Sequence, residues 1–349
     1  MTEIDNISFN ELVGHALVVH STILPEQLAI LDNSSKYRPE GIKQNVNDEE
    51  SLSAIFDTMS NINRMAIEDD HLCTGKNGPS FRQALKLTTT KLAALVEGRQ
   101  VRYVELGPEP WKSCTILTQL FEAGIDLQQY IGVDINPKSE DTMRKALTPI
   151  IGADKFKYLI ADFYKCSIDD FPEISTDTQD IVTIVTNLGF QEGNDLPSRI
   201  GQMLSRITRK GDLVLSEMQL FNGSVNPCGI VVENKSETIR NFYHHDEMLR
   251  FSALVGAQFD ESIKASFDWK SKYLFNLVPL DTEVGSVNVA TTLVLVNING
   301  EEKYVLTNSC LKYTQEQFKR AREATGTFLV SDSQETGDGS IVFQISERC

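Results

Sequence analysis

Short apolar runs alternate with amphipathic stretches through the middle of the chain. Five runs are almost continuously apolar, as expected for strands that are buried on both faces: residues 101–106, 129–135, 156–163, 180–188 and 213–220. Several of the stretches between them carry apolar residues at helical spacing: 113–124, 139–152 and 196–207. Strands and helices in this rhythm predict βαβ units and a doubly wound, mostly parallel sheet.

The chain before this alternation reads mostly as helices. Helical patterns cover 25–33, 50–70 and 78–98, and the last has Pro79 near its start and Gly98 just past its end. In that segment one helical stripe is apolar, made of Leu85, Leu92, Leu95 and Val96, while Leu87 falls off the stripe. We therefore expect a helical N-terminal segment, or lid, over residues 1–97.

After residue 222 the strand–helix alternation ends. Residues 236–257 predict a helix, and 273–280, 287–300 and 302–313 predict strands of an antiparallel unit with a hairpin turn at 297–300. A helix over 314–326 begins at the N-cap Thr314, with Gln317 three residues on, and 340–346 predicts a closing strand. The expected fold is α/β: a helical segment (1–97), a Rossmann-like core (98–222) and a C-terminal α+β unit that completes the fold (223–349).

Composition narrows the class of partner. A net charge of −16 in 349 residues argues against nucleic acid, which calls for a basic face. No apolar run approaches the roughly 20 residues of a membrane span, and no signal peptide opens the sequence, so we expect a cytoplasmic protein. The six cysteines and five histidines show no metal-ligand spacing, so no metal site is expected. A homodimer is compatible with the sequence.

Candidate chemistry gathers where the predicted strands end. In an open α/β sheet, ligands bind at the carboxyl ends of the strands, which here are Glu105-Leu106-Gly107, Asp134-Ile135, Asp162-Phe163 and Asn187-Leu188-Gly189. An acid at the end of a second strand suits a ribose diol, because one carboxylate accepts from both hydroxyls. Each strand end alone has an ordinary explanation as a turn or a cap. Their order along consecutive βα units favours a nucleoside site.

The loop after the first of these strands indicates which kind of nucleoside cofactor the site would bind. A dinucleotide places its pyrophosphate at a helix N-terminus behind a G-x-G-x-x-G loop. Here Gly107 is followed by Pro108, Glu109 and Pro110, and the two prolines remove two backbone donors. S-adenosylmethionine carries no phosphate and tolerates that loss, so the loop favours the methyl donor.

With these residues, the chain resembles the class I S-adenosylmethionine-dependent methyltransferases. More narrowly, it is similar to the branch typified by the histidine Nα-methyltransferase of ergothioneine biosynthesis, over roughly residues 30–345. The resemblance rests on the segments SKYRPEGI, YVELGPEP, YIGVDINPK, TNLGF and YVLTNSCLKYTQEQFKRA. It implies a Rossmann-like methyltransferase sheet, a small-molecule substrate and S-adenosylmethionine as the cofactor.

The resemblance also implies roles for individual residues. Those expected to contact the cofactor are Tyr37, Glu105, Gly107, Pro108, Asp134, Ile135, Asp162, Phe163, Asn187 and Gly189. Several positions depart from the branch. Its glycine two residues after Glu-Leu-Gly is Glu109 here, its lysine falls one place early, as Lys112, and its Gly-Asn pair, which grips the ends of the amino acid, is Gly189-Phe190. The Glu-x-Ser that recognises imidazole in the branch appears as Asn308-Ser309-Cys310, so histidine is not the expected substrate.

The expected reaction is N-methylation of a small amino-acid-like or amine metabolite by in-line transfer, in which the enzyme aligns the reactants and excludes water. We predict a substrate wall made of Phe190, Gln191, Tyr243, Asn308 and Cys310, of which all except Gln191 are also candidate positioning residues. An aromatic wall residue could stabilise a methylammonium by cation–π contact. Two alternatives stay open: O- or C-methylation of a natural-product intermediate, and a methyltransferase-like module that binds without catalysis.

Overall fold

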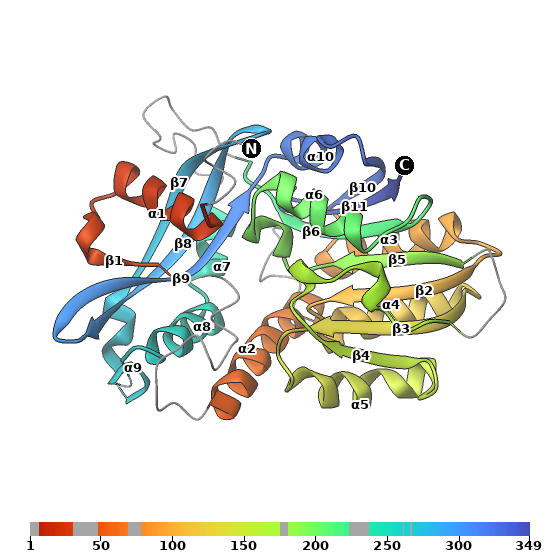
Figure 1. Cartoon of the computed structure of the whole chain (residues 1–349), viewed down its shortest axis with the longest axis horizontal. Helices are drawn as coiled ribbons and strands as arrows, with labels where there is room; N and C mark the ends of the chain where they lie inside the picture. Colours follow the sequence, from red (N-terminus) through yellow and green to blue (C-terminus); the bar gives the residue numbers. More distant parts are fainter. Residues whose placement is uncertain are drawn as a thin grey trace.

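Two β-sheets lie side by side along the long axis of the chain (Figure 1). The structure is a computed structural model, and it describes residues 7–30, 48–68, 78–174, 181–222, 237–260, 262–265 and 267–349. Tyr37, one of the predicted cofactor contacts, lies outside the described residues.

The larger sheet has seven strands in the order β10-β11-β6-β5-β2-β3-β4. Its strands are β2 (Gln100–Leu106), β3 (Asp126–Asp134), β4 (Phe156–Ile160), β5 (Ile181–Asn187), β6 (Leu213–Gln219), β10 (Phe328–Glu335) and β11 (Ile341–Arg348). Strands β2 to β6 are parallel, while β11 runs antiparallel to both β6 and β10. The chain moves outward from β2 to β4 and then returns to β5 on the other side, which confirms a doubly wound, Rossmann-like sheet.

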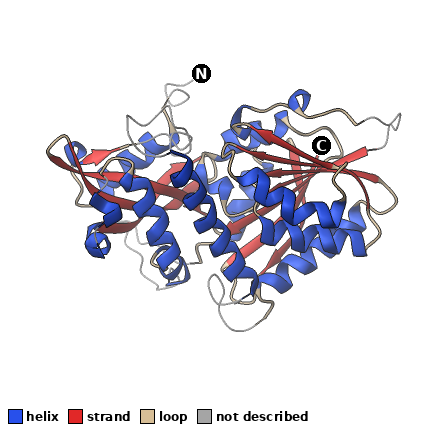
Figure 2. Cartoon of the chain, turned by 90° about the horizontal axis from the view of Figure 1, so that it is seen from below, coloured by secondary structure: helices blue, strands red, loops and turns tan. Residues whose placement is uncertain are grey.

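Helices cover both faces of this sheet (Figure 2). One face carries α3 (Phe81–Leu95), α4 (Pro110–Glu122) and α5 (Ser139–Ile151), and the other carries α6 (Pro197–Arg206) and α10 (Gln315–Glu323). Successive strand residues enter different core clusters: Tyr103 belongs to the first cluster, and Val104 to the second. This two-sided burial explains why the strands read as continuous apolar runs.

The smaller sheet has the order β1-β9-β8-β7. Its strands are β1 (Leu28–Ala29), β7 (Tyr273–Thr282), β8 (Gly285–Ile298) and β9 (Glu301–Lys312). Helix α1 (Phe9–His20) packs on one face, where the Ser309 hydroxyl donates to the Asn10 side chain at 2.5 Å. Helix α8 (Asp246–Ala257) packs on the other face, where the Ser252 hydroxyl donates to Thr292 at 3.3 Å. Helix α2 (Asp48–Glu68) packs against both α8 and α4, so it connects the two sheets.

Several predicted elements are confirmed. Thr314 caps α10 in a capping box with Gln317, and the β8–β9 turn has left-handed φ angles at Asn299 (55°) and Gly300 (89°), which suits a tight hairpin. Leu85, Leu92 and the C-cap Val96 are buried as the stripe predicts, but Leu95 is 44% exposed.

Other elements differ from the prediction. Residues 25–30, the described part of the helix predicted over 25–33, do not form a helix: a 3-10 turn at Pro25–Gln27 leads into β1, which pairs in parallel with β9. The single helix expected over 236–257 is two helices, α7 (Glu237–Tyr243) and α8, because the His245 side chain accepts the Glu247 N–H at 3.2 Å and starts a new helix. Strand β10 was not among the predicted elements.

The segment 223–349 contributes to both sheets. Strands β7, β8 and β9 belong to the smaller sheet, while β10 and β11 complete the larger one beside β6. The predicted boundaries at 97/98 and 222/223 stay predictions.

Candidate functional site

The loop after β2 lies at the carboxyl edge of the larger sheet, where β2, β3, β4 and β5 end. Gly107 adopts a left-handed φ of 57°, and its N–H donates to the Val133 carbonyl of β3 at 2.8 Å. A Cβ added at Gly107 would collide with the Gln191 amide. The angle favours glycine here, and a larger residue would also displace the Gln191 side chain.

The backbone N–H groups at the N-terminus of α4, the helix that follows this loop, are already hydrogen-bonded. Glu109 is the N-cap of α4, and its carboxylate accepts the N–H groups of Trp111 at 2.9 Å and Lys112 at 2.7 Å. Pro110 occupies the first helical position, where its missing N–H costs nothing. The donors that would cradle a pyrophosphate are therefore already used by a buried acid, which disfavours a dinucleotide. Burial also raises the pKa of Glu109 to about 7.

Glu105 lies beneath the loop and is only 2% exposed. Its carboxyl group accepts from the Ser113 hydroxyl at 2.8 Å and from the Tyr130 hydroxyl at 2.9 Å. Burial raises its pKa to about 8, so it is largely protonated at neutral pH. These bonds tie β2 to α4 and β3, and a direct contact of Glu105 with the cofactor stays a prediction.

Lys112 makes a buried ion pair across the sheet. Its ammonium lies 2.7 Å from the Glu217 carboxylate of β6, and both side chains are almost completely buried. The same Glu217 oxygen accepts the Gly189 N–H at 3.0 Å. The pair thus holds the loop after β5 against α4, a structural role for the displaced lysine.

Asp134 ends β3 next to this loop. Its carboxylate accepts the Asn136 N–H at 2.9 Å, and burial raises its pKa to about 6. The Asn136 side chain donates to the Leu52 carbonyl of α2 at 3.0 Å, so α2 covers the turn that begins at Ile135. Since β2 and β3 are paired, Asp134 and Gly107 lie on neighbouring strand ends, as predicted.

Asp162 and Phe163 follow β4, the next strand outward along the same edge. Asp162 caps a short 3-10 turn by accepting the Tyr164 N–H at 3.2 Å, and Lys165 lies 3.5 Å from its carboxylate. The Phe163 ring is half-buried and packs against Tyr164. Their role at an adenine ring stays a prediction.

Two amide side chains at this edge have polar atoms without partners. Asn187 ends β5 beside Leu106 and is completely buried, yet neither its oxygen nor its nitrogen is hydrogen-bonded. Gln191 donates to the carbonyls of Leu106 at 3.2 Å and Gly107 at 3.4 Å, while its own oxygen has no partner. Buried polar atoms are rarely left unpaired, so these amides mark a place where a polar ligand would be favourable.

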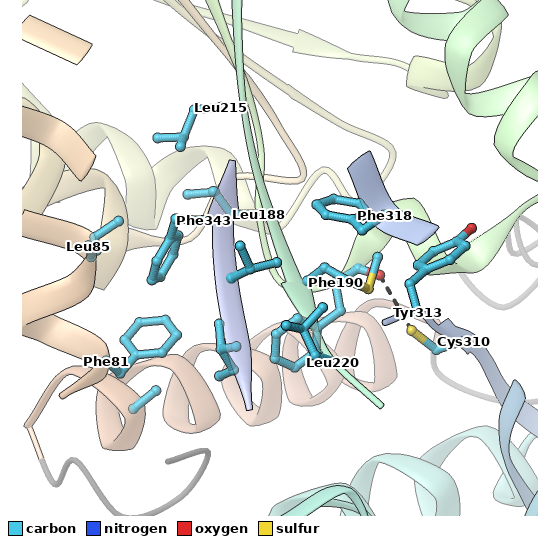
Figure 3. Packing of buried hydrophobic residues seen from close by; sticks show 14 of the residues in the cluster. Phe81, Leu85, Leu188, Phe190, Leu215, Leu220, Cys310, Tyr313, Phe318 and Phe343 are labelled. Carbon is cyan, nitrogen blue, oxygen red and sulfur yellow. Dashed lines mark hydrogen bonds between the residues drawn. The ribbon is translucent and has the colours of Figure 1, made fainter. Parts of the chain in front are cut away.

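The predicted substrate wall is largely assembled between the two sheets. Phe190 follows Gly189 and adopts a left-handed φ of 64°, which is strained for a bulky residue. The Cys310 thiol donates to the Phe190 carbonyl at 3.5 Å (Figure 3). Burial, with a smaller contribution from the neighbouring Cys310 thiol, raises the pKa of Tyr243. Asn308 is half-buried on the same strand face as Cys310, whereas Gln191 lies over Gly107 instead.

Sequence reasoning missed two residues of this wall. The Lys312 ammonium lies 4.9 Å from the Phe190 ring centroid, 5.2 Å from that of Tyr243 and 3.3 Å from the Cys310 sulfur. The available signal was the strand alternation, which places Lys312 on the face of Asn308 and Cys310. The second is Gly193, where an added Cβ would lie 2.5 Å from the Cys310 sulfur and 2.8 Å from the Leu311 carbonyl oxygen.

Within the described ranges, His, Cys, Asp and Glu side chains form no group of three that could hold a metal ion. No helix in this part of the chain has the length and apolar character needed to cross a membrane.

No protein-family model matches the sequence. No curated protein matches it either. Among solved structures, the chain is similar to one described as a possible exported protein from Bordetella parapertussis, with a TM-score of 0.43 and 10% identity over 100% of this chain and 99% of the other.

Two further structures to which the chain is similar are methyltransferases. The CcbJ methyltransferase from Streptomyces caelestis has a TM-score of 0.41 and 9% identity, covering 84% of this chain and 98% of its own. A Burkholderia thailandensis N1-methyltransferase solved with 1,6-didemethyltoxoflavin and S-adenosylhomocysteine has a TM-score of 0.38 and 9% identity, covering 88% and 93%. These similarities are too distant to support an inference about function, which is argued below from the geometry of the site.

Proposed function

We propose that this chain is an S-adenosylmethionine-dependent methyltransferase that acts on a small molecule. One observation carries the proposal: the carboxyl edge offers an acid at the end of β3 and a left-handed glycine directly after β2, while Glu109 caps the helix N-terminus that a pyrophosphate would need. A nucleoside without a phosphate fits that combination, and a dinucleotide does not.

The residues at this edge suit the parts of such a cofactor. Asp134 and Ile135 would hold the ribose, Asp162 and Phe163 the adenine, and Gly107, Pro108, Asn187 and Gly189 the amino-acid portion. The unpaired amide of Asn187 supports this fit, because a polar ligand would satisfy it. When bound, the cofactor supplies an electrophilic methyl group on a sulfonium.

The chain's own contribution would be alignment and the exclusion of water. Phe190, Tyr243 and Cys310 form a largely buried surface next to the loop that follows β5. The Lys112–Glu217 pair fixes that loop through the Gly189 N–H. A rigid wall beside the predicted cofactor would hold an acceptor atom in line without a catalytic acid or base.

For the acceptor we retain N-methylation of an amino-acid-like metabolite as the proposal. The rings of Phe190 and Tyr243 both face one cation, as in a cation–π site, but that cation is the Lys312 ammonium of the chain itself. O- or C-methylation of a natural-product intermediate stays a second candidate.

Turnover can test the proposal directly. The protein would be incubated with S-adenosylmethionine labelled with ¹³C at the methyl group and a panel of amino acids, amines and phenols. We expect one class to gain a labelled methyl, and its ¹³C chemical shift distinguishes N-, O- and C-methyl products. Binding of S-adenosylhomocysteine without any turnover would favour the non-catalytic module instead.

A further inference from the structure

We propose that Gln219 recognises the methyl acceptor through its side-chain amide, which makes the acceptor a neutral compound with an N–H next to a C=O, such as a carboxamide or a lactam. The inference rests on the proposed function, since it names a class of substrate for the same site. Gln219 is the last residue of β6, and it is completely buried. Neither its side-chain oxygen nor its side-chain nitrogen has a hydrogen-bond partner.

This lack of partners is unusual within the part of the chain that the structure describes. Several buried side chains there have one unpaired polar atom, but only two buried amides have both atoms unpaired, Gln219 and Asn187. These two residues end neighbouring parallel strands, β6 and β5, at the edge where the predicted cofactor residues lie. Because an unpaired buried amide costs free energy, two of them at one edge of the sheet indicate a bound ligand rather than a packing defect.

The order of the strands assigns the two amides to different parts of the reaction. Across the carboxyl edge the strands follow the order β3, β2, β5 and β6. Asp134 ends β3 and Gly107 follows β2, and these are the predicted ribose and loop positions of the cofactor. Asn187 comes next in this order and suits the amino-acid portion. Gln219, one strand further, lies on the side from which an acceptor would approach the methyl group.

The end of β6 also adjoins the predicted substrate wall. Leu220, the residue after Gln219, packs in the same buried cluster as Phe190 (Figure 3). The Phe221 N–H donates to the Tyr313 carbonyl at 2.7 Å, which joins this end of β6 to the end of β9. A group bound by the Gln219 amide would therefore lie next to the wall.

Local charge determines what kind of group fits. Glu217 lies two residues before Gln219 on the same strand face, and its carboxylate already has the Lys112 ammonium at 2.7 Å. A free carboxylate or ammonium bound here would lose its hydration without gaining an unpaired counter-charge from Glu217 or Lys112. An anion would also satisfy only the amide nitrogen and a cation only the oxygen, whereas an adjacent N–H and C=O satisfy both. For an acceptor derived from an amino acid, this means an amide in place of the free acid.

The unpaired amide permits a direct test with 2-pyridone, a planar ring that presents an N–H next to a C=O. Protein labelled with ¹⁵N at its glutamine side chains is saturated with S-adenosylhomocysteine, and Gln219→Leu identifies the Gln219 signal by its loss. N-methyl-2-pyridone, which lacks the donor, and benzoate, which carries a charge, are the matched probes. We expect a saturable shift of the Gln219 signal with 2-pyridone, and at least about tenfold weaker binding of the other two probes.

Two variants separate ligand binding from packing. Gln219→Leu should weaken 2-pyridone binding by at least about tenfold, and affinity for S-adenosylhomocysteine should stay within about twofold. Its thermal unfolding midpoint should not fall, because leucine replaces a buried amide that has no partner in the chain. Gln344→Leu is the matched control, since Gln344 is also buried but lies on β11 opposite Ser216, inside the sheet. This variant should bind 2-pyridone within about twofold of the wild type.

The opposite results overturn the inference. No saturable shift at Gln219 up to about 20 mM 2-pyridone would do so, as would equal responses to the three probes. A clear fall in the unfolding midpoint of Gln219→Leu would show that the amide supports the fold, for instance through a buried water. Failure of the wild type to bind S-adenosylhomocysteine would overturn the proposed function, whereas cofactor binding without a response to 2-pyridone would overturn this inference alone.

Discussion

Buried acids set the electrostatics beneath the predicted cofactor loop. Glu105 bonds to Ser113 and Tyr130, and Glu109 caps the first turn of α4. Burial raises the pKa of Glu105 to about 8 and that of Glu109 to about 7. Each group therefore keeps its proton in the folded chain at pH values where the unfolded chain has lost it.

The first prediction concerns the pH dependence of stability. Between about pH 5 and pH 8 the folded state binds more protons than the unfolded state, so the free energy of unfolding should fall as pH rises. Glu105→Gln mimics the protonated acid and should reduce that slope by up to about 1.4 kcal/mol per pH unit. Urea unfolding at several pH values measures both slopes. Both proteins contain Glu109, so its contribution cancels in the difference between the two slopes. Equal slopes would contradict the raised pKa given to Glu105.

The second prediction concerns the Lys112–Glu217 ion pair. Lys112→Met leaves Glu217 buried without its cation and should cost about 3–5 kcal/mol in the free energy of unfolding. Adding Glu217→Gln removes the stranded charge, so the double variant should recover most of the loss. Chemical denaturation of the wild type, the single variant and the double variant measures the loss and its recovery. A cost below about 1 kcal/mol for Lys112→Met would show that the pair does not hold the loop.

At the scale of elements, the contact between the turn after β5 and strand β9 builds the substrate wall. The 3-10 turn Gln191–Asn194 brings Gly193 against Cys310 and Leu311, and this contact places Phe190 beside Lys312. A side chain at position 193 would push the turn away from the strand.

The third prediction therefore concerns Gly193→Ala. The added methyl would meet the Leu311 backbone as well as the Cys310 sulfur, and we expect a loss of about 1–3 kcal/mol. Gly201→Ala in the middle of α6 is the matched control, because its methyl would meet only a Thr325 side chain and alanine favours a helix. Thermal unfolding should show a clear loss for the first variant and little change for the second. Similar transitions for both would contradict the packing described here.

Elements of this fold were predictable where their pattern is local. The strands that end at Leu106, Asp134 and Asn187 are contiguous apolar runs, and the Thr314 cap of α10 is a four-residue signal. Strand β1 could not be predicted, because two residues become a strand only by pairing with β9, which lies far along the chain.

Likewise, only part of the candidate site could be predicted from the sequence. The strand-end residues follow from local sequence, but the partner of Lys112 is 105 residues away. Lys312 was overlooked because a lysine in a strand normally reads as exposed. Only the meeting of β9 with the turn after β5 shows that it is buried.

At the scale of the whole molecule, the predicted cofactor edge faces the smaller sheet, and α2 connects the two. The first turns of α2 reach Asn136 beside Asp134, while the rest of the helix packs on α8. A cofactor at this edge would contact one sheet and lie close to elements attached to the other. Ligand binding should therefore stabilise the chain as a unit, by about 2.7 kcal/mol at a ligand concentration 100 times its Kd.

Calorimetry with S-adenosylhomocysteine tests the central claim most directly. We predict saturable binding of one ligand per chain to the wild type, and at least about tenfold weaker binding to Asp134→Ala, because the ribose would lose its carboxylate acceptor. A cooperative unfolding transition of the variant is the control for its fold. Equal binding by Asp134→Ala would remove only the role given to Asp134. No binding by the wild type would contradict the account of this chain as a methyltransferase.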